Sequence, residues 1–365
     1  MVRIPAQGHP RLLFPLDRPI LRRCANERAQ GAETMKVAVT TGPHRVEILE
    51  RPPCEAGADQ VLVAVESVGV CGTDAHIWAG EYPAATLPLV QGHEITGWAD
   101  GRRVVIEPAF SCGHCFACRV GRANACARSA VLGVHLDGAL SELIAVPAAR
   151  VHAAEGLSAV TAAMVEPAAI AMQAVARSQP TAGADALVLG CGPIGLLATR
   201  ALVDRGVRVA ALDRVPARAQ RARRFGATYA EPVGETLEAH QRAAIVEWAG
   251  GEGPSIVIEA TGAAGSLATA LDLVVSAGRI VAVGISAAQA RLPMNTLPYK
   301  ELDLVGSRNS RALFPEAIEF AGRHHELVEE LVTHRFPLAR TQDAFALAHS
   351  GDPALGKTLI EVGGA

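Results

Sequence analysis

Aromatic residues are scarce in this sequence, at 4% of 365 residues, and the formal net charge is only −3. A charge so close to zero gives no basic face for nucleic acid and no attraction to an anionic membrane. The chain also lacks any apolar run near the ~20 residues that a membrane span requires. We therefore expect neither nucleic acid nor a membrane as a partner.

The first 34 residues lack the continuous apolar segment of a secretory signal, although they are rich in arginine and proline. We expect residues 1–34 to be a disordered extension ahead of Met35, and the alternative is an arginine-rich targeting or partner-binding segment. The remaining length exceeds one ordinary core, and half of the residues are hydrophobic, so two domains are expected.

The eight cysteines do not have the spacing of a disulfide framework. Four of them lie close together at C-x2-C-x2-C-x7-C, namely Cys112, Cys115, Cys118 and Cys126. Four thiolates on one short loop suit a closed, tetrahedral structural zinc site. With no signal ahead of them, they favour a reducing cytoplasm.

A second set of zinc-ligand residue types lies at 71–76 and 91–94, and includes Cys71, His93 and Glu94. Asp74 is a candidate to orient a ligating histidine, or else a helix N-cap. Glu166 lies in an alanine-rich helical stretch beside a proline, so it either partners a metal or occupies a first helical turn. The isolated His135 is expected to be an ordinary loop residue or a satisfied polar residue.

A β-α-β pattern begins near Asp185. The strand 186–189 runs into a glycine turn that contains Gly190, Gly192 and Gly195, and the next strand ends at Asp213. Such glycines let a dinucleotide pyrophosphate approach a helix N-terminus, and the acid binds a ribose hydroxyl. Asp213 favours NAD, whereas the adjacent Arg214 favours NADP. Further strands at 255–260, 279–284 and 302–306 alternate with helical stretches, which predicts a doubly wound parallel sheet.

The order of these motifs resembles the zinc-dependent medium-chain dehydrogenase/reductase family, near its alcohol, polyol and threonine dehydrogenase branches. The resemblance runs from Met35 to the C-terminus. It implies an α/β fold in which a GroES-like β-rich catalytic domain (35–177) carries the structural zinc lobe. A doubly wound Rossmann domain (178–308) is inserted, and residues 309–365 return to the catalytic domain.

The resemblance also implies roles for individual residues. Cys71, His93 and Glu166 would bind a catalytic zinc, with Glu94 as a ligand in some states, and the four clustered cysteines would bind a structural zinc. Thr73 would contact the substrate oxygen, His76 would end a proton relay, and Glu94 would belong to the catalytic set. The predicted cofactor-binding residues are Gly190, Gly192, Pro193, Ile194, Gly195, Asp213, Arg218 and Val283.

The function implied is hydride transfer between a secondary alcohol, such as a polyol or sugar acid, and NAD, with zinc as a Lewis acid. The alternatives are a threonine or simple alcohol dehydrogenase, an NADP-dependent sugar dehydrogenase, or a non-enzymatic zinc or redox sensor on the same fold. Arg308 would have one of three roles: it would bind a substrate carboxylate, bind a cofactor phosphate, or stabilise the boundary between the domains. The resemblance suggests a homodimer or homotetramer.

Overall fold

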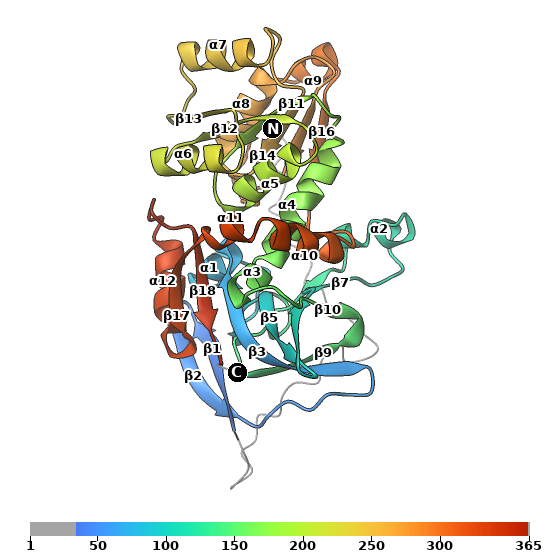
Figure 1. Cartoon of the computed structure of the whole chain (residues 1–365), viewed down its shortest axis with the longest axis vertical. Helices are drawn as coiled ribbons and strands as arrows, with labels where there is room; N and C mark the ends of the chain where they lie inside the picture. The colour runs from blue at the N-terminus through green and yellow to red at the C-terminus, as the bar shows by residue number, and fades with distance from the viewer. Residues whose placement is uncertain (1–33, 364–365) are drawn as a thin grey trace, which may run out of the picture.

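A computed structural model describes residues 34–363, which form two lobes stacked along the long axis of the molecule (Figure 1). Except for Thr34, the segment predicted to be a disordered extension lies outside the described residues. Among the described helices, none has both the length and the apolar character needed to cross a bilayer.

The upper lobe contains a six-stranded, fully parallel sheet. In spatial order its strands are β13 (Tyr229–Pro232), β12 (Arg208–Asp213), β11 (Asp185–Leu189), β14 (Ile256–Glu259), β15 (Arg279–Ala282) and β16 (Asp303–Gly306). This is the 3-2-1-4-5-6 order of a doubly wound dinucleotide fold, as predicted. The order reverses at β11, so a crevice is expected where β11 ends and the glycine turn begins.

Helices cover both faces of this sheet, which explains why its strands are hydrophobic almost without alternation. They are α5 (Pro193–Val203), α6 (Pro216–Arg224), α7 (Ala239–Trp248), α8 (Ala264–Leu273) and α9 (Thr296–Lys300). Val188 and Val209 are fully buried on one face, and Leu187 and Val257 are fully buried on the other.

The lower lobe is built mainly from antiparallel strands, as expected for a β-rich domain. A seven-stranded sheet contains β10 (Val151–Ala153), β6 (Arg102–Ile106), β5 (Glu94–Ala99), β3 (Gln60–Val70), β18 (Lys357–Glu361) and β17 (Val332–Pro337), with β9 (Leu143–Pro147) paired to β3. Smaller sheets contain β2 (Arg45–Arg51), β1 (Met35–Gly42) and β4 (Leu89–Val90), and β7 (Ala109–Phe110) with β8 (Ala130–Val131).

The remaining helices are α1 (Gly72–Trp78), α2 (Phe116–Arg119), α3 (Ala159–Ala163), α4 (Val165–Ser178), α10 (Phe314–Arg323), α11 (His325–Glu329) and α12 (Thr341–His349). Short 3-10 turns occur at Ala123–Ala125, Ala148–Arg150 and Leu338–Arg340. The alanine-rich stretch divides at Met164, and Pro167 lies in the first turn of α4. A proline is tolerated there because its missing N–H has no partner within the helix.

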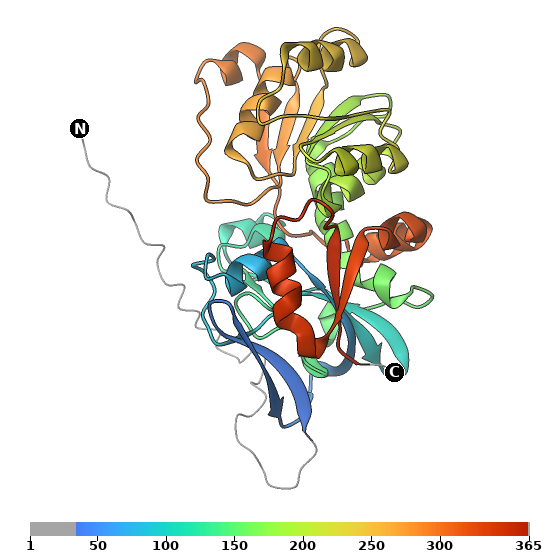
Figure 2. The same cartoon turned by 90° about the vertical axis from the view of Figure 1, so that its left-hand side faces the viewer.

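Helix α4 connects the lobes, because it packs against β5 below and against α5, β14 and β15 above. The C-terminal segment returns to the lower lobe, where β18 pairs antiparallel with β3 (Val70 opposite Thr358). In Figure 2 the C-terminal helix α12 lies beside α1, and the two helices are in contact. Residues from the two ends of the chain therefore meet around α1.

Candidate active site

Asp74 joins the two ligand clusters that the sequence predicts. It is fully buried in the first turn of α1, and its carboxylate accepts hydrogen bonds from the backbone amides of Cys71 (2.9 Å) and Gly92 (3.3 Å). Its carbonyl accepts a bond from the amide side chain of Gln91 (2.9 Å). Asp74 is thus part of a capping box, and it also fixes the segment that precedes His93.

His93 follows that segment and is buried, with Nδ1 at 3.7 Å from the Asp74 carboxylate. This separation is longer than a hydrogen bond, and Nδ1 has no hydrogen-bond partner among the described residues. Burial opposes the charged imidazolium, but the Asp74 carboxylate and the Cys71 thiol outweigh it and raise the pKa of His93 well above its ordinary value. The surroundings of His93 therefore favour positive charge.

Glu94 begins β5 and is also buried. One carboxylate oxygen accepts a bond from the Lys357 ammonium, while the other has no partner in the described part of the chain. Burial opposes the charge of Lys357, but Glu94 and Cys71 outweigh it and raise the pKa of Lys357. Lys357 was not predicted from the sequence, because its pairing with Glu94 depends on β18 lying next to β3.

Glu166 lies in the first turn of α4 and is half-buried. Burial is the main cause that raises the pKa of Glu166 to about 7; His93 lowers it and the Glu94 carboxylate raises it. These charge effects place Glu166 close to His93 and Glu94. A carboxylate in such surroundings is stabilised by a nearby cation.

The ligand atoms of Cys71, His93 and Glu94 all lie within 4.8 Å of one another. Thiolate, imidazole and carboxylate together are a donor set typical of catalytic zinc. The unpaired oxygen of Glu94 and the raised pKa of Glu166 are both consistent with a cation at this point. The residues present therefore fit a zinc ion, and Cys71, which is the least buried of the three, leaves one side open.

Thr73 and His76 lie three residues apart on α1, so they share one side of the helix. The Thr73 hydroxyl has no hydrogen-bond partner within residues 34–363 and is half-exposed. His76 is exposed at the last turn, where its Nδ1 lies 2.8 Å from Glu81. The helix thus leads from the neighbourhood of Cys71 to solvent.

The four clustered cysteines converge as their spacing predicts. The sulfurs of Cys115 and Cys118 are 3.5 Å apart, those of Cys115 and Cys126 3.7 Å, and those of Cys126 and Cys112 3.5 Å. Zn–S bonds of about 2.3 Å in a tetrahedron separate neighbouring sulfurs by about 3.8 Å. The arrangement fits zinc with little movement.

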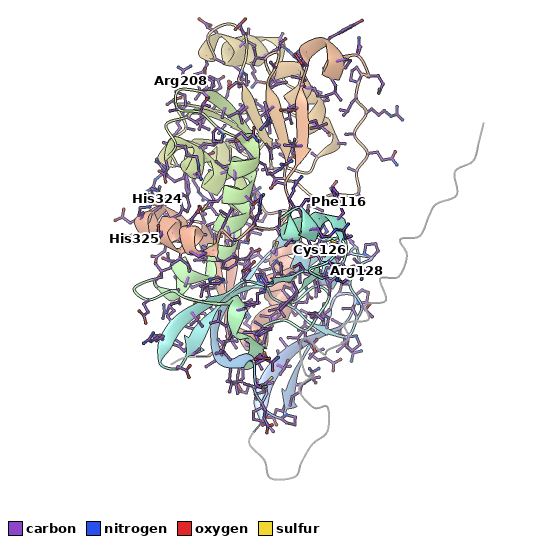
Figure 3. The ribbon with its side chains drawn as sticks, turned by 90° about the vertical axis from the view of Figure 1, so that its right-hand side faces the viewer. Phe116, Cys126, Arg128, Arg208, His324 and His325 are labelled. Carbon is purple, nitrogen blue, oxygen red and sulfur yellow. The ribbon has the colours of Figure 1, made fainter. Side chains whose placement is uncertain are left out.

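Backbone amides in this lobe stabilise the thiolate form of Cys115. Amide hydrogen bonds, first from Cys118 and then from Ala127, lower the pKa of the Cys115 thiol to about 6. A thiolate is the form that binds zinc. Figure 3 shows Cys126 within the lobe, with Phe116 and Arg128 near its surface.

The glycine turn lies at the carboxyl end of β11, where Gly192 is the N-cap of α5. A side chain at Gly195 would collide with the Gly190 carbonyl at 1.8 Å, so glycine is needed there for close packing of helix and strand. By contrast, a Cβ on Gly192 would meet no protein atom within 4 Å. The open space at Gly192 and the helix N-terminus that begins at Pro193 and Ile194 fit a pyrophosphate.

The other predicted cofactor residues lie at the same edge of the sheet or beside it. Asp213 ends β12 and accepts bonds from the amides of Cys191 (2.7 Å) and Val215 (2.8 Å). Val283 directly follows β15 and is half-buried. Arg218 on α6 donates to the Leu355 carbonyl (2.9 Å), two residues before Lys357, so it connects the two lobes.

His135 fits the role expected for it, because its Nδ1 accepts a hydrogen bond from the Val131 N–H (3.2 Å) within its own loop. Burial and the nearby Arg308 guanidinium lower the pKa of His135. The loop that carries His135 is fixed to the segment before His93, because Ala139 N–H donates to the Gly92 carbonyl (3.1 Å). Arg308 is exposed, and its side chain makes no hydrogen bond or ion pair within the described chain. Its backbone carbonyl accepts a bond from Asn124 (2.8 Å) in the zinc lobe.

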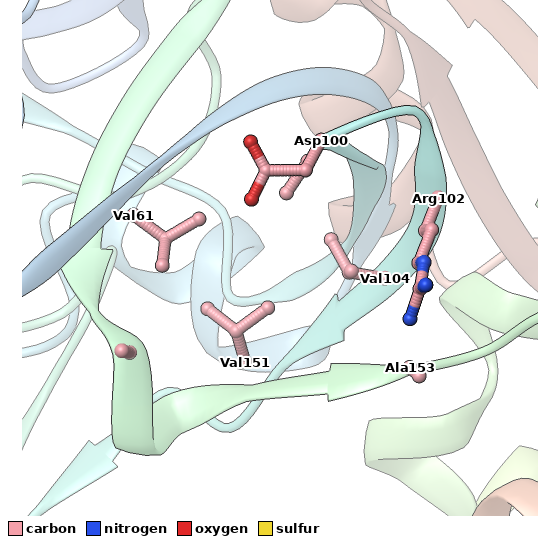
Figure 4. A pocket seen from close by; sticks show the side chains of 8 residues that line it. Val61, Asp100, Arg102, Val104, Val151 and Ala153 are labelled. Atoms are coloured by element: carbon pink, nitrogen blue, oxygen red, sulfur yellow. The ribbon is translucent and has the colours of Figure 1, made fainter.

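A hollow on the lower lobe lies apart from these clusters (Figure 4). Its lining is formed by Val61, Ala99, Asp100, Arg102, Val104, Ala148, Val151 and Ala153. It contains neither a cysteine nor a histidine, so it offers no chemistry comparable to that at Cys71.

Two family models match the chain. The "Alcohol dehydrogenase GroES-like domain" matches residues 57–156 and the "Zinc-binding dehydrogenase" matches residues 193–323. The chain is 33% identical to the starvation-sensing protein RspB of Escherichia coli K12, over 89% of this chain and 99% of that protein. It is also 33% identical to the L-galactonate-5-dehydrogenase of the same organism, over 86% and 94%.

A solved structure of an RspB alcohol dehydrogenase from E. coli CFT073, in complex with NADH, is similar with a TM-score of 0.82. The two are 32% identical, and the match covers 90% of this chain and 99% of that one. These similarities agree with the zinc lobe, the glycine turn and the sheet order described above. The chain belongs to the zinc-containing medium-chain alcohol dehydrogenase family, and it is an NAD(P)-dependent zinc dehydrogenase that acts on CH–OH groups.

Proposed function

We propose that the chain oxidises the secondary hydroxyl of a polyol or sugar acid with NAD, at a catalytic zinc between the lobes. The observation that carries the proposal is the convergence of Cys71, His93 and Glu94 within 4.8 Å. Glu166, on α4, lies outside that group but close enough to His93 and Glu94 for their charges to affect it, and α4 packs against the dinucleotide-binding sheet. Because fold alone does not define substrate, the proposal depends on the residues of the site.

We assign Glu166 as the third zinc ligand, with Glu94 as the alternative. Glu94 lies within the 4.8 Å group, but its charge is already balanced by Lys357. No hydrogen bond or ion pair to Glu166 occurs within the described residues, so its carboxylate is the one that lacks a dedicated cation. Even partial burial disfavours an unpaired charge, and zinc would provide the partner that Glu166 lacks.

Bound zinc supplies Lewis acidity that lowers the pKa of the substrate hydroxyl, and NAD accepts the hydride. Thr73 accepts a hydrogen bond from that hydroxyl and, as it takes this proton, gives up its own hydroxyl proton toward His76 and solvent. His76, farther along the same helix, returns a proton to solvent through its exposed end. Gly192 and the start of α5 would hold the pyrophosphate, and Asp213, Arg218 and Val283 would contact the rest of the cofactor.

Asp213 supports NAD, because its carboxylate would repel the 2′-phosphate of NADP. The RspB structure contains NADH, which agrees with this choice. NADP is the alternative, because Arg214 next to Asp213 is exposed and available to a phosphate.

Arg308 supports a substrate that carries a carboxylate. Its guanidinium has no other partner in the described chain, and it lies near His135, whose loop adjoins the metal-ligand segment. A planar guanidinium binds a carboxylate bidentately. The relative named L-galactonate-5-dehydrogenase agrees with a sugar acid as substrate.

The test is a panel of sugar acids, neutral polyols, threonine and simple alcohols, with NAD and NADP in parallel, read by absorbance of the reduced cofactor. We expect turnover of a sugar acid with NAD, and loss of turnover in Cys71→Ser with NADH binding retained. Arg308→Gln should lower kcat/KM for the sugar acid and leave neutral polyols unchanged. Activity restricted to neutral polyols would contradict the role of Arg308, and full activity of Cys71→Ser would contradict the zinc site. The oligomeric state and the cytoplasmic location stay predictions.

A further inference from the structure

Two histidines from distant parts of the chain share one carboxylate oxygen on the surface. Glu81 Oε2 lies 2.8 Å from His76 Nδ1 and 3.3 Å from His349 Nε2. His76 is in the last turn of α1, Glu81 follows it in the next loop, and His349 is in the last turn of α12. The three ligand atoms lie within 4.8 Å of one another.

The surrounding structure holds these groups in place. Glu81 N–H donates to the His76 carbonyl (2.8 Å), which fixes the turn after α1. The His349 ring packs edge-on at 6.1 Å from Trp78, itself buried, and at 6.1 Å from the His76 ring. Helices α1 and α12 are in contact. The cluster is therefore not formed by long, freely rotating side chains.

The donor set and its spacing suit a borderline divalent cation. Two imidazoles and a carboxylate bind Zn²⁺, with Zn–N and Zn–O bonds of about 2.0–2.2 Å. Tetrahedral ligands at that distance are separated by about 3.3 Å, which matches the 3.3 Å between His349 and Glu81 and requires the 2.8 Å between His76 and Glu81 to lengthen. Two hydrogen bonds, first from His76 and then from His349, lower the pKa of the exposed Glu81 carboxyl, so the carboxylate is ionised at neutral pH.

We propose that His76, Glu81 and His349 form a surface Zn²⁺ site, separate from the structural zinc and from the Cys71 site. Its ion would replace the proton shared between the histidines and Glu81, with Nδ1 of His76 and Nε2 of His349 as nitrogen donors. The side chains of His76, Glu81 and His349 are 58%, 51% and 33% exposed, so water can fill the remaining coordination positions of the ion.

Occupation of this site has a consequence that rests on the proposed function. In the proposed function, His76 returns protons to solvent. Its Nδ1 is the nitrogen that contacts Glu81. A metal on Nδ1 removes that nitrogen from proton exchange. Micromolar free zinc would then inhibit turnover, although both other zinc sites stay filled.

The test compares the zinc-loaded wild-type enzyme with His349→Ala, and with His325→Ala as a matched change of an exposed helical histidine away from the cluster. Each enzyme is dialysed against micromolar free Zn²⁺, its zinc content is measured, and its turnover is measured with and without zinc. The wild type and His325→Ala should bind one zinc beyond the two family sites and lose turnover. His349→Ala should bind this zinc at least about tenfold more weakly, the lower end of what loss of a supporting group costs a metal site, with unchanged turnover in zinc-free buffer.

The outcomes distinguish the surface zinc site from the proposed role of His76 as the proton exit. Retention of the additional zinc in His349→Ala, or its absence from the wild type, would overturn the site. Inhibition that is equal in wild type and His349→Ala would overturn its inhibitory role. Binding that depends on His349 but leaves turnover unaffected would support the metal site and refute His76 as the proton exit.

Discussion

The ammonium of Lys357 binds the carboxylate of Glu94 across 263 positions of sequence, inside the lower lobe. Both side chains are almost completely buried, at 7% and 2% exposure. Glu94 is adjacent to the ligand His93, so this ion pair connects the last strand of the protein to the metal-ligand segment.

Removal of one partner of the Lys357–Glu94 ion pair should strongly destabilise the fold. Lys357→Met leaves the Glu94 charge buried without its cation, and we expect a loss of about 3–5 kcal/mol in the free energy of unfolding. The measurement is urea unfolding of enzyme with matched zinc content. The double variant Lys357→Met with Glu94→Gln should recover more than half of that loss, since no unpaired charge remains; a double variant as unstable as the single one would disprove this explanation.

The two carboxylates near His93 should differ in their effect on zinc. Glu166→Gln removes the carboxylate that has no dedicated cation, so we expect loss of the catalytic zinc while the lobe zinc is retained. Glu94→Gln in the Lys357→Met background is the matched control, because it removes the Glu94 charge without leaving the Lys357 ammonium buried and unpaired. The measurement is metal analysis after dialysis against a weak chelator. If this control loses the ion and Glu166→Gln keeps it, the assignment of the third ligand is reversed.

The four-cysteine lobe should depend on its metal. Cys115→Ser removes a sulfur that lies 3.5 and 3.7 Å from two others, and three ligands hold zinc less tightly than four. We expect loss of the structural zinc and faster proteolysis within 112–126. Cys191→Ser changes a buried cysteine outside both metal sites and should keep the full zinc content. Normal zinc content in Cys115→Ser would contradict the site.

Cofactor preference should respond to the charge of Asp213. Asp213→Asn keeps one of the two oxygens that accept from the amides of Cys191 and Val215, and it removes the repulsion of a 2′-phosphate. The ratio of kcat/KM for NADP to that for NAD should rise by about tenfold, which corresponds to about 1.4 kcal/mol. An unchanged ratio, with wild-type stability, would show that Asp213 does not select the cofactor.

Acid should weaken the contact between α5 and α10. Burial raises the pKa of Asp204, but hydrogen bonds from His324 (2.7 Å) and Arg200 (3.0 Å) outweigh it, so the pKa lies below its ordinary value. Because the folded pKa is the lower one, the stabilisation is complete above the unfolded value of about 3.9 and is lost as the pH falls through the folded value.

The measurement is urea unfolding of the wild type and Asp204→Asn across this range. The difference in stability should be constant at neutral pH and should shrink below about pH 4. A difference that grows on acidification would have the wrong sign for this carboxylate.

Short motifs allowed prediction where a few adjacent residues carry the chemistry. The cysteine spacing predicted the lobe, and the glycine turn with Asp213 predicted the parallel sheet, because both depend on local backbone geometry. The convergence of Cys71 with His93 was expected from the zinc-ligand residue types of two short clusters and from the family resemblance. Its physical cause, the bonds of buried Asp74 to the amides of Cys71 and Gly92, was not evident in the sequence.

By itself, the sequence determined the element types, the zinc-lobe spacing and the dinucleotide turn, since these need only neighbouring residues and hydrophobic periodicity. Only the tertiary structure decided which distant side chains meet. Lys357 reaches Glu94, His349 reaches Glu81 and Arg308 lies near His135 because β18 pairs with β3, α12 packs against α1, and the chain passes the zinc lobe between the two domains. Such contacts depend on how strands pair and helices pack across long separations, and no local pattern encodes that.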